Sequence, residues 1–187
     1  EMYSRLVGSE MCIRDSIILM PEVPFAKKKF IDKVKQTVAS EGFCVVVASE
    51  GTRYKNGMFL ADSGLKDAFG HKQLGGVAPV LAQMISSIGL KNHWAVSDYL
   101  QRSARHISSK TDLDQAYAVG KKAVEFALAG KNAVMPVIKR LSDKPYKWKI
   151  ESAPLSKVAN VEKTLPKRYI SKDGFGITSK GIDYLKP

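Results

Sequence analysis

The stretch IILMPEVPFAKKKFIDKVKQTVASEGFCVVVASEG, residues 17–51, decides the fold. It opens with a short apolar run at 17–20 and closes with a continuous apolar, β-branched run at 43–48. Between them, apolar residues recur at helical spacing over residues 25–39. Uninterrupted runs such as 43–48 are typical of parallel strands buried on both faces. Strand, helix and strand in this order predict a βαβ unit with a right-handed crossover.

The rest of the chain continues the alternation of helices and strands. The pattern predicts a helix over 77–88, a short strand at 94–96 and a helix ending near Ala129, with Thr111 or Asp112 as its N-cap. The apolar stripe expected along that second helix consists of Ala116, Val119, Ala123, Phe126 and Ala127. Further strands at 132–138 and 146–150 and a short helix at 180–184 follow. We therefore predict an α/β, Rossmann-like fold with a mostly parallel sheet flanked by helices.

The first residues do not fit this pattern. Residues 6–16, LVGSEMCIRDS, resemble the in-frame translation of a sequencing-library adapter. We therefore expect residues 1–16 to be an artefact and residues 17–187 to carry the native protein, with a native sequence upstream of Ile17 missing. The end at Pro187 has no closing element, so we expect the native chain to continue there as well.

Composition fits one packed domain of ordinary size. Apolar residues make up 44% of the chain, and no apolar run approaches the roughly 20 residues of a membrane span. Outside the first 16 residues Cys44 is the only cysteine, and it stands inside a predicted core strand. A lone core thiol is typical of a reducing compartment, so we expect a cytoplasmic protein without membrane contact.

The formal net charge of +12 favours anionic partners without saying which. Nucleic acid, phosphorylated metabolites and acidic surfaces stay open on charge alone. One hypothesis is a non-catalytic basic α/β module that binds nucleic acid. Charge supports it, but no motif does, because Trp94 and Trp148 show no base-stacking pattern.

Two short strings offer groups suited to a phosphorylated polyol. Glu22 follows the first predicted strand, and Pro24 keeps the chain extended there. Tyr99 and Arg102 lie three residues apart after the predicted strand at 94–96. Carboxyl ends of strands in an open α/β sheet are where ligands bind, and arginine grips phosphate through two N–H groups. From spacing alone, Glu22 as a cap or surface charge and Arg102 in a surface ion pair remain open alternatives.

Other chemistries find little support in the sequence. The three histidines, His71, His93 and His106, have irregular spacing and no cysteine partners, which argues against a zinc site. Gly75 and Gly76 before a helix are a weak phosphate-loop signal that a turn explains equally well. We find no nucleotide-binding glycine motif, paired catalytic carboxylates or nucleophile elbow, and we predict no metal site in this chain.

Several ordered strings together resemble the 6-phosphofructokinases, most closely the bacterial pyrophosphate-dependent branch. The resemblance runs from about Ile17 to the last residue. The strings are ILMPEVPF (18–25), SEG (49–51), DAFGH (67–71), DYLQRSARH (98–106), SKTD (109–112) and QAYAVG (115–120). Each string is weak by itself, and their order and spacing carry the likeness.

The resemblance implies site residues. Glu22 matches the family's glutamate that contacts fructose 6-phosphate, and Tyr99 and Arg102 match the two ends of its sugar-phosphate motif. His93 stands where many relatives have an arginine that reaches the neighbouring subunit's site, which puts that contact in doubt. Arg105 and Lys110, just downstream, are further candidates for phosphate or cross-subunit contacts.

The resemblance also implies what this chain does not contain. We expect it to be the C-terminal, sugar-phosphate side of a glycolytic phosphotransferase. The donor-binding half, the catalytic aspartate and the Mg²⁺ ligands then belong to the missing N-terminal half. The whole enzyme would phosphorylate fructose 6-phosphate at C1, with pyrophosphate as donor, reversibly, or alternatively ATP. We expect a homodimer or homotetramer, and no turnover from this chain alone.

Overall fold

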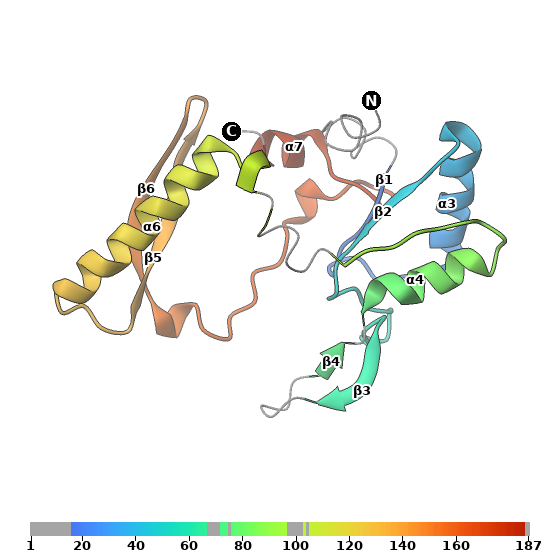
Figure 1. Ribbon diagram of the computed structural model, residues 1–187, viewed down its shortest axis with the longest axis horizontal. Coiled ribbons are helices and arrows are strands. Elements are labelled where there is room, and N and C mark those ends of the chain that lie inside the picture. The colour runs from blue at the N-terminus through green and yellow to red at the C-terminus, as the bar shows by residue number, and fades with distance from the viewer. Residues whose placement is uncertain (1–15, 67–71, 75, 97–102, 104, 186–187) are drawn as a thin grey trace. The chain divides into compact units, whose positions relative to one another are not determined.

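The structure is a computed structural model that describes residues 16–66, 72–74, 76–96, 103 and 105–185 (Figure 1). These residues divide into two compact units. The first comprises the described residues up to Val96 together with 165–182, and the second those from 97 to 164 together with 183–185. Each unit is described by itself below.

A βαβ element forms the centre of the first unit. Strand β1 (Ser16–Leu19) pairs in parallel with β2 (Val45–Ala48), and Ile17 lies opposite Val46. Helix α3 (Lys27–Glu41) connects them and ends at Gly42, whose φ of +80° suits a residue without a side chain. The predicted βαβ unit is confirmed, except that Ser16, which we assigned to the artefact, lies in β1.

Helix α3 begins two residues later than predicted because Phe25 has another role. The Phe25 N–H donates to the Arg53 carbonyl at 2.7 Å, and Phe25 forms an isolated parallel bridge with Tyr54. Ala26 is extended and serves as the N-cap. From there α3 turns Phe30 and Val34 inward, both almost fully buried against β1.

Strand β2 is buried on one face only, which corrects the expectation from residues 43–48. Because side chains alternate along a strand, Cys44, Val46 and Ala48 pack on the core. Val47 points to the other face and is 52% exposed. The continuous apolar run at residues 43–48 therefore does not mean that both faces of β2 are buried.

Helix α4 (Val77–Ser86) completes the core of the first unit with Val77 and Leu81. Before it, β3 (Asp62–Lys66) and β4 (Lys72–Leu74) form an antiparallel pair that the sequence analysis did not predict. The predicted strand at 94–96 is wrong: this segment has no regular structure, and Trp94 and Val96 are at least half exposed.

The C-terminal part of the first unit runs beside β1. It contains the short 3-10 helix Lys167–Tyr169 and helix α7 (Ser179–Leu185), whose last residues belong to the second unit. The N–H of Ile18 donates to the Phe175 carbonyl at 2.9 Å. Strand β1 therefore has β2 on one edge and the chain around Phe175 on the other.

The second unit packs helix α6 (Lys110–Leu128) on an antiparallel hairpin of β5 (Val134–Asp143) and β6 (Tyr146–Pro154), as Figure 1 shows. It also holds the 3-10 helices Arg105–Ile107 and Leu155–Lys157. The N-cap of α6 is Ser109, whose hydroxyl accepts the Asp112 N–H at 3.0 Å, and not Thr111 or Asp112.

The packing of α6 differs from the predicted stripe. Phe126 is buried as expected, but Ala116, Ala123 and Ala127 are exposed. Gln115 is buried instead, because its amide donates to the Tyr146 hydroxyl at 2.8 Å. The α/β class, with a parallel strand pair and flanking helices, is confirmed, and two antiparallel strand pairs accompany it.

Candidate functional site

The loops that follow β1 and β2 meet at the carboxyl ends of these strands. The Ser49 N–H donates to the Leu19 carbonyl at 3.1 Å. The buried Thr52 hydroxyl lies 2.7 Å from the Ser49 carbonyl and 3.4 Å from that of Leu19. Thr52 therefore links the two strand ends at the edge where ligands of α/β sheets bind.

Glu22 lies in the loop that leaves β1 and is half-buried. Its Oε1 accepts the backbone N–H of Leu165 at 2.7 Å, a contact across 143 positions of sequence. A carboxylate has about four lone-pair sites, so this bond leaves capacity for ligand hydroxyls. The position of Glu22 beyond the carboxyl end of β1 agrees with the sequence prediction, whereas the Leu165 contact was not foreseen.

Glu50, in the loop after β2, is engaged by the protein itself. Its two carboxylate oxygens lie 3.3 and 3.2 Å from the N–H of Val77, the first residue of α4. A negative side chain stabilises this end of a helix by satisfying N–H groups and opposing the helix dipole. The weak phosphate-loop signal before α4 therefore coincides with a helix end that already holds a carboxylate.

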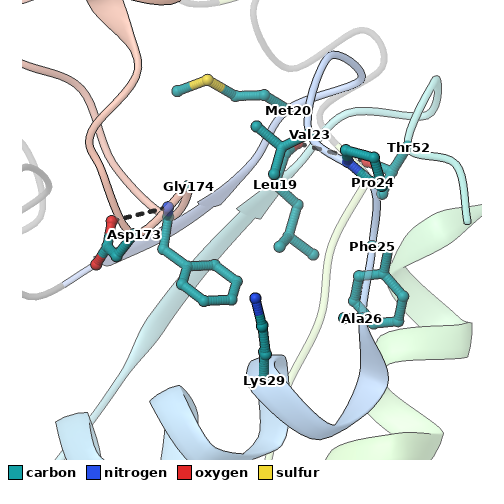
Figure 2. Close-up of a pocket in the computed structure, with 11 residues that line it drawn as sticks. Leu19, Met20, Val23, Pro24, Phe25, Ala26, Lys29, Thr52, Asp173 and Gly174 are labelled. Atoms are coloured by element: carbon teal, nitrogen blue, oxygen red, sulfur yellow. Dashed lines mark hydrogen bonds between the residues drawn. The ribbon is translucent and has the colours of Figure 1, made fainter. Parts of the chain in front are cut away.

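A small cavity of about 90 Å³ lies beside the β1–α3 loop (Figure 2). Its walls are mostly apolar, and Figure 2 shows Lys29 extending toward it from the first turn of α3. Typical small-molecule pockets measure about 300–1,000 Å³. This cavity by itself is too small to enclose a hexose phosphate. Its other walls come from Leu19, Met20, Val23, Pro24, Phe25, Ala26, Thr52, Asp173, Gly174 and Phe175.

Asp173 organises the turn that closes this cavity. Its Oδ1 accepts the Phe175 N–H at 3.1 Å and the Ser171 hydroxyl, and its Oδ2 lies 3.3 Å from the Lys33 ammonium. Burial raises the pKa of Asp173, but these hydrogen bonds and the Lys33 charge outweigh it, so the pKa is below its ordinary value. The turn therefore depends on an ionised carboxylate.

The remaining predicted site residues are not brought together by the described structure. Tyr99 and Arg102 lie outside the described residues, so their convergence with Glu22 stays a prediction. His93 is exposed in an irregular segment of the first unit. Arg105 begins a 3-10 helix of the second unit, and Lys110, exposed at the start of α6, pairs with Asp114 at 2.5 Å.

The described part of the chain contains neither a cluster of metal ligands nor a helix suited to span a membrane. No group of three or more His, Cys, Asp or Glu side chains there could hold a metal ion. None of the described helices combines the length and the apolar character needed to cross a membrane.

The chain is similar to known phosphofructokinases over nearly its whole length. Pyrophosphate–fructose 6-phosphate 1-phosphotransferases from Halomonas elongata and Methylococcus capsulatus are 59% and 56% identical over 172 residues, which is 91% of this chain and 41% of each relative. A solved pyrophosphate-dependent phosphofructokinase from Marinobacter aquaeolei superposes with a TM-score of 0.74 at 51% identity, covering 97% of this chain and 42% of that one. No protein-family model matches the chain.

These likenesses, together with the α/β fold, place the chain in the phosphofructokinase family. The family members to which this chain is 51–59% identical are pyrophosphate-dependent enzymes. The resemblance predicted from the sequence motifs is confirmed. The chain spans about two fifths of the length of the relatives it matches, which is consistent with a C-terminal part of such an enzyme.

Proposed function

We propose that this chain is the sugar-phosphate-binding side of a pyrophosphate-dependent 6-phosphofructokinase. The whole enzyme transfers a phosphoryl group from pyrophosphate to the C1 hydroxyl of fructose 6-phosphate, giving fructose 1,6-bisphosphate in a reversible reaction. The observation that carries the proposal is a glutamate fixed beyond the carboxyl end of β1 in a chain 56–59% identical to enzymes of that name. That edge of the sheet is where α/β proteins bind ligands.

Three residues of this chain bind the acceptor in this proposal. The Glu22 carboxylate accepts hydrogen bonds from sugar hydroxyls, since an ionised carboxylate is purely an acceptor. Arg102 grips the 6-phosphate through two parallel N–H bonds, and the Tyr99 hydroxyl adds a third group. His93, Arg105 and Lys110 contribute positive charge around the phosphate or toward a neighbouring subunit.

No residue of this chain is assigned to the chemical step. Phosphoryl transfer depends on positioning and on stabilising charge that spreads over the transferred group. We assign the catalytic aspartate and the Mg²⁺ ligands to the part of the enzyme that this chain lacks, since the relatives are more than twice as long. The whole enzyme is proposed to be a cytoplasmic homodimer or homotetramer.

Two assays test this proposal. The purified 187-residue chain, titrated with fructose 6-phosphate in a thermal-shift assay, should show saturable stabilisation that Glu22→Gln and Arg102→Ala each abolish. The same titration with fructose provides the control for the phosphate. Saturation that persists in both variants would overturn the residue assignment.

The second assay addresses the donor and the need for the missing part. The chain alone should show no turnover of fructose 6-phosphate with Mg²⁺ and either pyrophosphate or ATP. The gene extended upstream should restore turnover with pyrophosphate and leave ATP inactive. Turnover with ATP but not pyrophosphate would contradict the proposed donor.

A further inference from the structure

A C-terminal stretch holds the loop that carries Glu22 at several points. We name residues 165–176 the return segment. Its Leu165 N–H donates to Glu22 Oε1 at 2.7 Å, and its Phe175 carbonyl accepts the Ile18 N–H at 2.9 Å. Its Asp173 pairs with Lys33 of α3 at 3.3 Å. The return segment therefore contacts β1, the loop after β1 and α3, all in the first unit.

We propose that the backbone N–H of Leu165 is a positioning group that orients the Glu22 carboxylate toward the sugar hydroxyls of the acceptor. The inference rests on the proposed function for the identity of the ligand. The hydrogen bond itself is independent of any ligand. A residue acting through Glu22 in this way is part of the acceptor site without touching the substrate.

This hydrogen bond fixes the Glu22 side chain before any ligand binds. A glutamate side chain has three rotatable bonds, and a free one loses that freedom when it binds a ligand. A hydrogen bond to a carboxylate is shorter and stronger than one between neutral groups, and the 2.7 Å separation lies in the range of such bonds. Holding Glu22 in one rotamer before the ligand arrives therefore favours binding.

The backbone at Leu165 is suited to present its N–H. Leu165 is followed by Pro166, and a residue before proline is restricted to extended conformations. Pro166 itself is extended, with φ −58° and ψ 131°. Pro166 therefore limits the backbone conformations open to the residue whose N–H binds Glu22.

A second contact fixes the same loop. Gly174 has φ of +79°, and a Cβ atom there would lie 3.0 Å from Val23 Cγ1. The glycine lets the return segment approach the residue that follows Glu22. Two points of the return segment thus contact this loop, one at the Glu22 carboxylate and one at Val23.

Leu165→Pro tests the proposal because proline removes the N–H and tolerates an extended backbone. Leu165→Ala is the matched control, since it loses the same side chain and keeps the N–H. In the fructose 6-phosphate titration, Leu165→Pro should bind about tenfold more weakly than Leu165→Ala, at equal unfolding midpoints. Equal affinities of the two variants would overturn the inference.

If Leu165→Pro fails to fold, an α-hydroxy acid at position 165 replaces it, because the resulting ester lacks the N–H and imposes no ring. The same tenfold loss supports the inference, and unchanged affinity overturns it.

A readout without ligand separates this inference from the proposed function. Hydrogen exchange of the Leu165 amide should be slower in the unaltered chain than in Glu22→Ala, measured by NMR. Equal exchange would overturn the positioning role, whatever the ligand. Slow exchange in a chain that does not bind fructose 6-phosphate would leave the positioned carboxylate in place and refute the proposed ligand.

Discussion

Gly174 lies directly against Val23, in a conformation that only glycine adopts without strain. Its φ is +79°, and an added Cβ would lie 3.0 Å from Val23 Cγ1, tighter than most real Cβ contacts, so Val23 would have to shift. The contact joins the turn organised by Asp173 to the loop that carries Glu22. A substitution that pushes Gly174 away from Val23 should therefore also displace the neighbouring Glu22.

Gly174→Ala should lower the free energy of unfolding by about 2 kcal/mol, because it adds left-handed backbone strain and a clash with Val23. Gly57→Ala is the matched control: Gly57 has φ of +84° and no atom within 4 Å of an added Cβ. The control should cost about 1 kcal/mol from the backbone alone. Urea unfolding of both variants measures the difference, and equal losses would contradict the Val23 contact.

Asp173 predicts a pH dependence of stability. Its pKa is lowered from 3.8 in the folded chain, because hydrogen bonds and Lys33 outweigh the effect of burial. The unfolded state then binds more protons than the folded state around that pH, so stability rises with pH there. The contribution is complete above the unfolded pKa and is lost as the pH falls through the lower folded pKa.

Asp173→Asn should therefore flatten the acid limb of the stability curve, measured as urea midpoints from about pH 6 down to about pH 2. Lys33→Met is a partial control, because it removes one of the groups that lower the pKa and keeps the carboxyl. Its curve should lie between the other two. An acid limb in Asp173→Asn as steep as in the unaltered chain would count against this assignment.

Local pattern was enough to predict the βαβ element, because its helix and strands are defined by neighbours in sequence. The faces of β2 were not predictable in the same way. A run of apolar residues does not say whether both sides of the strand are covered, and Val47 is half exposed. The strand expected at 94–96 failed for a related reason: its few apolar residues found no pairing partner among the described strands.

In the candidate site, too, the position of a residue along the chain could be predicted, whereas its contacts with distant residues could not. That Glu22 follows β1 could be predicted, since a strand end and a proline mark it. The Leu165 N–H that binds its carboxylate could not, because every residue except proline carries such a group and 143 positions separate the two. The Asp173–Gly174 pair signals a turn, but no local pattern says which loop that turn contacts.

Arg140 predicts a stability effect within the second unit. Its guanidinium lies 4.8 Å from the centre of the Tyr146 ring and 4.5 Å from that of Tyr184. Its Nη1 donates to the Tyr184 carbonyl at 2.8 Å, and its Nε lies 2.6 Å from the Asp143 carboxylate. These contacts combine stacking of a planar cation on two rings with one donated hydrogen bond and one ion pair.

Arg140→Lys should lower the free energy of unfolding by about 1–2 kcal/mol, because lysine keeps the charge but loses the planar group that stacks on the Tyr146 and Tyr184 rings. The neighbouring Lys139→Gln is the control. Lys139 is 54% exposed, and its ion pair with Glu151 should contribute less than about 1 kcal/mol. Thermal unfolding followed by circular dichroism compares the two, and a larger loss in the control would refute the role of Arg140.

Glu50 predicts the stability of α4. Both of its carboxylate oxygens face the Val77 N–H, and Val77 is almost fully buried in the core of the first unit. Glu50→Ala should cost about 1 kcal/mol, because it leaves a helix N–H without its acceptor and removes a charge that opposes the helix dipole. Glu50→Gln should recover part of this loss, since an amide oxygen still accepts a hydrogen bond. Hydrogen exchange of the Val77 amide locates the effect: it should become faster in Glu50→Ala than in the unaltered chain, and equal exchange in these two would show that the carboxylate does not cap α4.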